Sequence, residues 1–396
     1  LFGRIGPPAA TSPITGISPL LVSFRTIPLE APVRILIKPF FSIARRCCSA
    51  ALGDLKPKDF AISALVGGKP NSKICFLIKF SISSCLLVKF FIDTVIIYSI
   101  WYRVNMLRIG ITSRALFNLS SSHSIFEKYG LEAYRKHQIS NENIPLGEGQ
   151  TFPLVKKLLN LNKLAEKDLV EVILLSRNSP DTGLRIFNSI EHHGLNIKKA
   201  AFCGGNSPHI YAKSFETHLF LSADLDDCRL STLNGIPSAR IMLTNKINNS
   251  DNLLRIAFDG DSVIFSDDSQ LIFENYGLEA FNRNEKNLAD EPLSKGPFQS
   301  FLEQLCILQQ SFPREDCPLR IALVTARSAP SHERVIKTLR DWNIRIDESL
   351  FLQGINKTAF LEDFLADIFF DDQFEICESA KHSVPTGQVI NLNSRN

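Results

Sequence analysis

Short apolar runs, each followed by a mixed stretch, recur along the chain between residues 106 and 392. We expect strands at 107–111, 254–258, 320–324, 350–352, 368–370 and 389–392, and helices within about 270–310 and at 333–342 and 358–365. Strands that alternate with helices are typical of a parallel sheet covered on both faces. Such sheets present their functional groups at the carboxyl ends of the strands, so the polar residues that follow these runs are candidates for a site.

The pattern is also repeated. Residues 107–109 (LRI) recur at 254–256, and residues 129–133 (YGLEA) recur at 276–280, both 147 positions downstream. After a net shift of two residues, the run that ends at Ser176 matches the run that ends at Thr325. Such self-similarity indicates two copies of one structural unit. We therefore predict an α/β fold of two repeated Rossmann-like units with parallel sheets, one at 106–246 and one at 247–396.

Residues 1–105 differ in composition, with 13 Lys or Arg against four Asp or Glu. Because Met106 directly precedes the first strand-like run, we expect the functional protein to start there and 1–105 to be an atypical leader, non-native or disordered. A membrane anchor or targeting segment is the alternative, since 74–102 is strongly apolar. Lys79, Lys89 and Asp93 interrupt it below the roughly 20 apolar residues that a spanning helix needs. We expect no membrane segment in 106–396.

Charge and cysteine usage exclude several classes of protein. The net charge is +3, and no block of Lys and Arg is interleaved with aromatic residues, so we do not expect polynucleotide binding. The nine cysteines form no C-x-x-C pair, which argues against a zinc knuckle and a compact disulfide framework. Reduced thiols and a cytoplasmic location fit this composition best.

Polar residues follow successive predicted strands of the second unit. In chain order they are Asp259, Asp261, Thr325, Lys357, Asp371 and Asp372. A carboxylate pair, a hydroxyl, an amine and a second carboxylate pair in this order resemble the four motifs of the haloacid dehalogenase-like phosphohydrolases. Each of these residues, taken alone, is more often found in a turn, at a strand end or on the surface without a catalytic role. Their joint order predicts a phosphate-transfer site.

The proposed chemistry explains why these residue types are needed. A carboxylate attacks a phosphate monoester only when nearby cations and donors offset the charge repulsion. We expect Asp259 to be the nucleophile, which forms an aspartyl-phosphate, and Asp261 to be the general acid and base. Thr325, Arg327 and Lys357 are the expected phosphate ligands.

A magnesium ion is the expected cofactor. Mg²⁺ prefers oxygen ligands and retains several waters. We expect Asp259, the backbone carbonyl of Asp261, Asp371 and Asp372 to supply its protein ligands.

The first unit lacks this chemistry at the positions that the repeat aligns with the second. Four residues without a carboxylate stand where the second unit has its aspartates: Thr112, Arg114, Ser222 and Ala223. We expect a pseudo-catalytic unit that packs against the second one. Arg114, Asn178 and Asn206 are its candidate contributions to the substrate pocket, although surface charges and an ordinary turn account for them equally well.

Several segments within 106–392 together resemble the cytosolic 5′-nucleotidases of type 1. They are 113–117 (SRALF), 204–208 (GGNSP), 221–224 (LSAD), 257–261 (AFDGD), 324–329 (VTARSA) and 369–373 (FFDDQ). The resemblance implies hydrolysis of nucleoside 5′-monophosphates such as AMP and IMP. It also implies Mg²⁺ dependence, a cytoplasmic location and the option of homo-oligomers.

Two other functions remain open on the sequence alone. A phosphatase of sugar phosphates or other small monoesters is the closer alternative. A non-catalytic nucleotide-binding scaffold is less favoured, because the second set of residues is intact. The segment between Asp261 and Thr325 is long enough for a small helical cap, in which Tyr276, Phe281 and Phe298 either stack on a base or pack in a core.

Overall fold

The computed structural model describes residues 106–244 and 251–392. They belong to one compact unit, Ile100–Asn396. The predictions of a leader or a membrane anchor fall on residues 1–105 and lie outside the described residues. Within the described ranges, no helix combines the length and the apolar character needed to cross a membrane.

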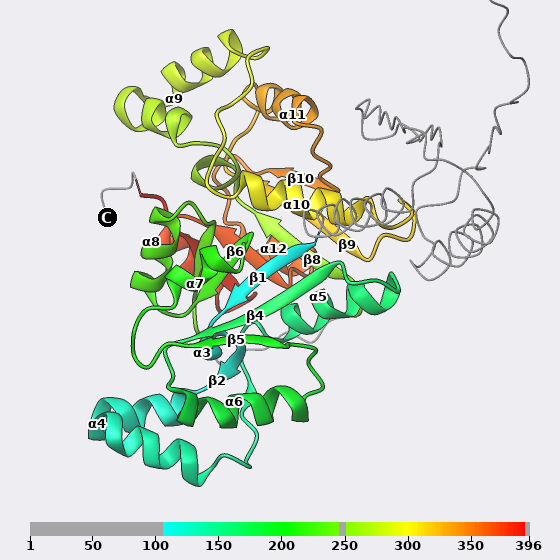
Figure 1. Cartoon of the computed structure of the whole chain (residues 1–396). Coiled ribbons are helices and arrows are strands. Elements are labelled where there is room, and N and C mark those ends of the chain that lie inside the picture. The colour runs from blue at the N-terminus through cyan, green and yellow to red at the C-terminus, as the bar shows by residue number, and fades with distance from the viewer. Residues whose placement is uncertain (1–105, 245–250, 393–396) are drawn as a thin grey trace, which may run out of the picture. The chain divides into compact units, whose positions relative to one another are not determined.

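A ten-stranded sheet organises the described part of the chain (Figure 1). Five strands from residues 107–241 lie side by side in the order β5-β4-β1-β6-β7, and every pairing among them is parallel. Their bounds are β1 (Leu107–Ile111), β4 (Val170–Ser176), β5 (Lys199–Phe202), β6 (Leu219–Ser222) and β7 (Ser238–Ile241). The central strand β1 is buried at all five positions, as its largely apolar sequence requires in a sheet covered on both faces.

The other five strands have the same order and the same parallel pairing. They follow as β10-β9-β8-β11-β12, with β8 in the position that β1 occupies in the first five. Their bounds are β8 (Leu254–Phe258), β9 (Leu319–Thr325), β10 (Glu348–Phe351), β11 (Ile368–Asp371) and β12 (Thr386–Val389). The predicted α/β fold with a mostly parallel sheet is thus confirmed. We expected separate sheets, whereas the strands form one.

The two halves of the sheet join through an antiparallel pair, β7 and β12. Arg240 lies opposite Gln388 in this pair. A side chain at Gly387 would place its Cβ 2.9 Å from the Phe370 ring and 3.2 Å from Ala239, so glycine permits the close approach at the junction. Because the pair is antiparallel, the carboxyl ends of the two half-sheets lie at opposite edges.

Helices connect successive strands and cover the sheet. In the first half they are α3 (Ser113–Leu116), α5 (Phe152–Leu164), α6 (Pro180–His192), α7 (His209–Ser214) and α8 (Leu225–Leu233), and a small hairpin pairs β2 (Phe117–Asn118) with β3 (Gly147–Glu148). In the second half they are η1 (Gly260–Ile264), α10 (Gln299–Gln309), α11 (His332–Asp341), α12 (Thr358–Asp363) and α13 (Phe374–Ala380). Buried rings from β8, β11, α10 and the residue before α10 pack together in the core of the second half: Phe258, Phe370, Phe301 and Phe298.

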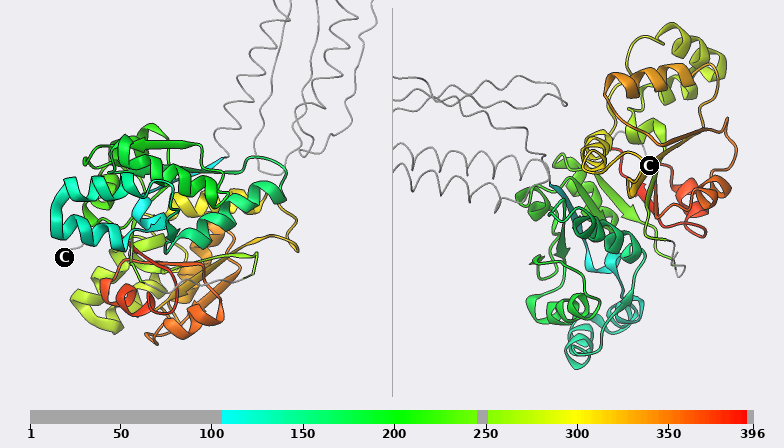
Figure 2. Two further views of the ribbon diagram at one scale, coloured as in Figure 1. Left: turned by 90° about the horizontal axis from the view of Figure 1, so that it is seen from below. Right: turned by 90° about the vertical axis from the view of Figure 1, so that its right-hand side faces the viewer.

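Two further helices, α4 (Ser120–Ser140) and α9 (Asp268–Asn287), are broken at equivalent glycines. Gly130 has φ 79° and ψ −176°, and Gly277 has φ 78° and ψ 179°. This region of backbone conformation is open to glycine and strained for other residues, which explains the shared YGLEA sequence at the breaks. Figures 1 and 2 show α4 and α9 far apart, one beside each half-sheet.

Candidate active site

Two neighbouring strands bring the first carboxylates of the site together. Asp259 follows β8 directly, and Asp371 is the last residue of β11. The strands are parallel, with Phe258 opposite Phe370, and the Asp259 backbone N–H donates to the Phe370 carbonyl over 2.8 Å. Both aspartates are buried, as expected for residues that extend apolar strands at the carboxyl edge of a covered sheet.

Lys357 lies between these two carboxylates. Its Nζ is 2.9 Å from Asp259 Oδ1 and 2.7 Å from Asp371 Oδ2, and the side chain is buried. Burial alone disfavours the ammonium, but the charges of Asp259 and Asp371 outweigh it and raise the lysine pKa. The site therefore carries a fixed positive charge next to the candidate nucleophile.

Burial acts on the nucleophile as well. Burial and the charge of the neighbouring Asp371, against the opposing charge of Lys357, together raise the pKa of Asp259 to about 7. An additional cation beside Asp259 would stabilise the ionised carboxylate and so lower its pKa.

A third carboxylate completes an acidic cluster. Asp259, Asp371 and Asp372 each offer an oxygen, and these oxygens lie within 4.8 Å of one another. Asp372 Oδ1 is buried and has no hydrogen-bond partner among the described residues. Burial, followed by the charges of Asp371 and Asp259, raises the pKa of Asp372 to about 8. Three close carboxylates with an unsatisfied buried oxygen fit a hard divalent cation with oxygen ligands.

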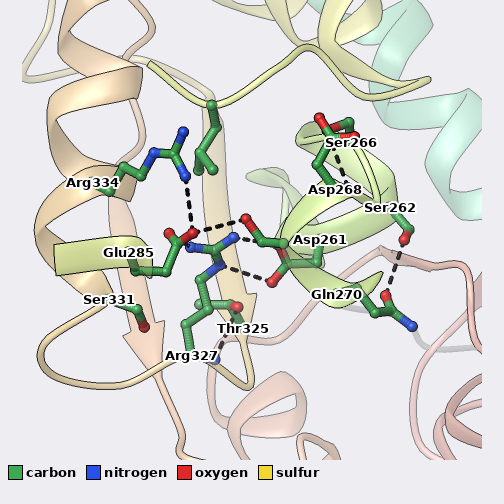
Figure 3. Close-up of polar contacts among 12 residues, drawn as sticks. Asp261, Ser262, Ser266, Asp268, Gln270, Glu285, Thr325, Arg327, Ser331 and Arg334 are labelled. Carbon is green, nitrogen blue, oxygen red and sulfur yellow. Dashed lines mark hydrogen bonds and ion pairs between the residues drawn. The ribbon is translucent and has the colours of Figure 1, made fainter. Parts of the chain in front are cut away.

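Asp261 lies in a different environment, where it forms an ion pair with Arg327. Arg327 Nε donates to Asp261 Oδ2 over 2.8 Å, and Nη2 donates to Oδ1 over 2.6 Å, which is the two-point geometry that a guanidinium and a carboxylate prefer (Figure 3). The Asp261 carboxylate is outside the acidic cluster. Its backbone carbonyl remains our predicted metal ligand.

Glu285, on α9, holds the other side of this pair. Its carboxylate accepts hydrogen bonds from Arg327 Nη1, from Arg334 Nη1 over 2.9 Å and from Ser269 Oγ over 2.9 Å. The Glu285 side chain is 0% exposed and that of Arg327 is 2% exposed. A chain of alternating charges thus links the end of β8 to α9 and α11. It runs from the half-buried Asp261 through the buried side chains of Arg327, Glu285 and Arg334.

Thr325 positions the turn that carries Asp261. It ends β9, is buried, and its Oγ1 accepts a 3.2 Å hydrogen bond from the Arg327 backbone N–H. A Cβ at Gly260 would lie 3.2 Å from this Oγ1, so glycine lets the turn approach the strand end. Ser262 has φ 61° in the same turn, the left-handed conformation that reverses the chain after the two aspartates.

The structure thus brings most of the predicted residues to one edge of the sheet. Asp259, Lys357, Asp371 and Asp372 form one cluster, while the Arg327 guanidinium is engaged by Asp261 and Glu285. A phosphate contact for Thr325, Arg327 and Lys357 remains a prediction. Glu285 and Arg334 were not predicted as site residues from the sequence, because isolated charges on α9 and α11 carry no local signal of burial.

The candidate pocket residues of the first half lie elsewhere. Arg114, Asn178 and Asn206 follow β1, β4 and β5, so they lie at the carboxyl edge of the other half-sheet, opposite the edge that carries Asp259. Asn178 accepts a 2.7 Å hydrogen bond from the Tyr134 hydroxyl, and Asn206 is exposed. The structure does not bring these three residues together with the acidic cluster.

A family model and a relative of known name match most of this chain. A family model described as 5′-nucleotidase matches residues 101–396, which include both halves of the sheet and every residue of the acidic cluster. Cytosolic 5′-nucleotidase 1B of Homo sapiens is 39% identical over 289 residues, or 70% of this chain and 47% of that protein. The chain therefore spans about half the length of this relative.

Two solved structures show only weak similarity. A crystal structure of histidinol dehydrogenase from Elizabethkingia anophelis gives a TM-score of 0.19 and 10% identity over 72% of this chain and 52% of that one. The S. aureus MnaA–UDP co-structure gives a TM-score of 0.18 and 9% sequence identity, and the match covers 71% of this chain and 78% of that one. Scores this low carry no argument about fold or function. The family model, in contrast, matches residues 101–396, which is most of the chain. This protein therefore belongs to the 5′-nucleotidase family.

Proposed function

We propose that this protein hydrolyses nucleoside 5′-monophosphates to nucleoside and phosphate, with Mg²⁺ as cofactor and an aspartyl-phosphate on Asp259 as intermediate. The observation that carries the proposal is the position of Asp259, between a buried lysine and two further carboxylates. Family membership supports the substrate class. The geometry supports a carboxylate nucleophile beside a cation site.

The reaction divides into two displacements at phosphorus. In the first, an oxygen of Asp259 attacks the phosphorus and the bond to the 5′ oxygen breaks. Asp261, which enters this step protonated and so no longer accepts from Arg327 through both oxygens, gives its proton to the departing alkoxide. In the second, Asp261 takes a proton from water, the water oxygen attacks phosphorus, and the bond to Asp259 breaks to release phosphate. Each residue returns to its starting state.

The surrounding residues lower the cost of bringing two anions together. Lys357, 2.9 Å from Asp259, offsets charge on the nucleophile and on the phosphoryl oxygens. Asp259, Asp371 and Asp372 would hold Mg²⁺, which when bound supplies further positive charge at those oxygens. Arg327 and Glu285 hold Asp261 in position through their buried hydrogen bonds.

We also propose that the two half-sheets are repeats of one haloacid dehalogenase-like unit, 106–246 and 247–396, of which the second is catalytic. Their identical strand order and the equivalent breaks at Gly130 and Gly277 support this reading. In the second unit, α9 is the small helical cap over the site, because its Glu285 reaches Arg327. A cytoplasmic location and assembly into homo-oligomers complete the proposal, the former supported by the name of the human relative.

Phosphate release tests the proposal directly. The chain would be assayed with Mg²⁺ or EDTA on AMP, IMP and a panel of sugar phosphates, alongside Asp259→Asn and the exposed control Asp316→Asn. We expect Mg²⁺-dependent release from the nucleotides that is lost in Asp259→Asn and kept in Asp316→Asn. Activity confined to sugar phosphates would overturn the substrate assignment, and retained activity in Asp259→Asn would overturn the mechanism.

A further inference from the structure

A cationic cavity of about 230 Å³ lies at the carboxyl edge of the first half-sheet. Its lining includes Arg114 and Ala223, which follow β1 and β6, and Arg240 and Met242 at the end of β7. Glu378 and Lys381, in and just after α13, close it from the second half. The antiparallel junction of β7 and β12 is what brings this part of the second half to that edge.

The charges in the cavity do not cancel. Lys381 is paired with Glu378 over 2.6 Å, but the guanidinium groups of Arg114 and Arg240 make no hydrogen bond or ion pair with any residue in the described ranges. Burial lowers the pKa of Arg114, the charges of Glu127 and Asp224 raise it in part, and the charge of Arg240 has the smallest effect, which lowers it. Two half-buried guanidinium groups that line one cavity, without a hydrogen-bonded partner of their own in the part of the chain that the structure describes, are stabilised by an anion that accepts their hydrogen bonds.

The cavity lies at the carboxyl edge of the first half-sheet, the edge that corresponds to the one carrying the acidic cluster in the second half. The repeat aligns Arg114 with Asp261 and Ala223 with Asp372, so a cation stands in place of one carboxylate and a small apolar group in place of another. Among the described residues, the acidic group that could hold a metal belongs to the second half. Thr112, which aligns with Asp259, carries no carboxylate that could accept a phosphoryl group.

We propose that this cavity binds a phosphoryl dianion and does not hydrolyse it. Two arginines offer the hydrogen-bond donors that match phosphate oxygens. A volume near 230 Å³ is below the roughly 300–1,000 Å³ of pockets that enclose whole small molecules, so the cavity takes the phosphoryl group itself. Inorganic phosphate and the phosphate of a nucleotide share this chemistry.

Calorimetric titration of the full 396-residue chain with inorganic phosphate in EDTA, at constant ionic strength, tests the proposal. EDTA removes any divalent cation from the acidic cluster at the other edge, and inorganic phosphate has no ester bond to hydrolyse, so the titration reports binding alone. We expect Arg114→Gln combined with Arg240→Gln to weaken binding by about tenfold or more, because each lost charge-assisted hydrogen bond contributes about 1.5–3 kcal/mol. The lysine pair Arg114→Lys with Arg240→Lys should retain part of the affinity.

Matched variants show whether phosphate binds in this cavity or elsewhere on the protein. Lys128→Gln combined with Lys136→Gln removes two exposed charges from the same half and should leave the affinity unchanged. Asp259→Asn, which abolishes the proposed hydrolysis, should bind phosphate like the parent. The proposal would be overturned if the parent did not bind phosphate, or if the lysine control lost as much affinity as the arginine pair. It would also be overturned if Lys357→Gln abolished phosphate binding while the arginine pair did not. Thermal melting of every variant identifies any that fails to fold.

Two further ligands distinguish the sources of the phosphoryl group. Equal affinities for AMP and phosphate would show that the cavity recognises the phosphoryl group alone. Tighter binding of AMP would show that the nucleoside adds contacts outside the cavity. Binding of adenosine with no binding of phosphate would contradict a phosphoryl site.

Discussion

Arg327 donates two hydrogen bonds, of 2.8 and 2.6 Å, to the carboxylate of Asp261. The same guanidinium also donates to Glu285, so its position is fixed from both sides. Because Glu285 belongs to α9 and Asp261 follows β8, any displacement of α9 is transmitted to the proposed acid and base through one side chain. This coupling predicts effects of mutation at a distance from the reacting atoms.

Glu285→Gln should impair both stability and turnover. It removes a buried charge that serves Arg327 and Arg334, and breaking such a pair typically costs about 3–5 kcal/mol in the free energy of unfolding. Arg327 then loses the partner that orients it toward Asp261, and we expect kcat to fall by roughly tenfold with a smaller change in KM.

Chemical denaturation and steady-state kinetics measure the two effects, with the exposed Glu315→Gln as control. A shifted pH profile of kcat would accompany a role in positioning Asp261. Loss of stability with kcat and its pH profile unchanged would mean that Glu285 is only structural.

Lys357→Gln should reduce kcat by about 10²–10³, the range found when one donor is removed from a charge-stabilising site. It also leaves Asp259 and Asp371 buried without their shared counter-charge, so the metal-free variant should melt below the parent. Mg²⁺ should narrow that difference, because the cation replaces part of the missing charge. A variant that melts like the parent in EDTA would contradict the proposed balance of charges.

The acidic cluster predicts a dependence of metal-free stability on pH. Burial raises the pKa of Asp259 to about 7 and that of Asp372 to about 8, whereas the unfolded aspartates titrate near pH ~4. Between these values the folded protein binds more protons than the unfolded chain, so the free energy of unfolding falls as pH rises from about 4 to about 8. Below that window, this contribution to stability is fully present.

Mg²⁺ should reverse this trend, because it binds the charged carboxylates and its binding releases protons. Thermal melts at pH 5, 7 and 9, with EDTA or Mg²⁺, measure both effects. We expect Mg²⁺ to stabilise the protein more at high pH, and the effect should be lost in Asp371→Asn. A stabilisation by Mg²⁺ that did not change with pH would be inconsistent with raised carboxyl pKa values.

The sequence was sufficient to predict the parts of the site that depend on local pattern. Asp259 and Asp371 extend apolar strands, so their positions at the sheet edge followed from the strands themselves. The ion pair of Arg327 with Asp261 and the burial of Glu285 depend instead on how α9 folds back over the site. Nothing in the local sequence around Glu285 distinguishes a buried charge from an exposed one.

The pairing of β7 with β12, which joins the two half-sheets, could not be predicted from the local sequence either. We predicted the last strand at 389–392, where the chain is apolar, whereas β12 spans Thr386–Val389 and includes Gly387. Glycine is a poor strand former, but an added Cβ at Gly387 would lie 2.9 Å from the Phe370 ring and 3.2 Å from Ala239, so the neighbouring strands approach closely only because this residue is glycine. The pairing of β12 with β7 places Arg114 and Arg240 at the opposite edge from Asp259.

The equivalent glycines offer a comparison within one molecule. Gly130→Ala and Gly277→Ala each place a side chain in a backbone conformation that costs about 1–3 kcal/mol, and no atom lies within 4 Å of the added Cβ at either position. Both variants should therefore lose similar stability. Only Gly277→Ala should also lower kcat. The reason is that α9 carries Glu285, which contacts Arg327 beside Asp261, whereas α4 lies beside the other half-sheet.

Denaturation curves and kinetics of the two variants, made in parallel, test whether α9 acts on the reaction. An equal fall in kcat for both would attribute the effect to general loss of stability. A fall in Gly277→Ala alone, with Gly130→Ala equally destabilised, would assign the control of Asp261 to the helix that bears Glu285. If neither variant changed kcat, α9 would cover the site without positioning its acid and base.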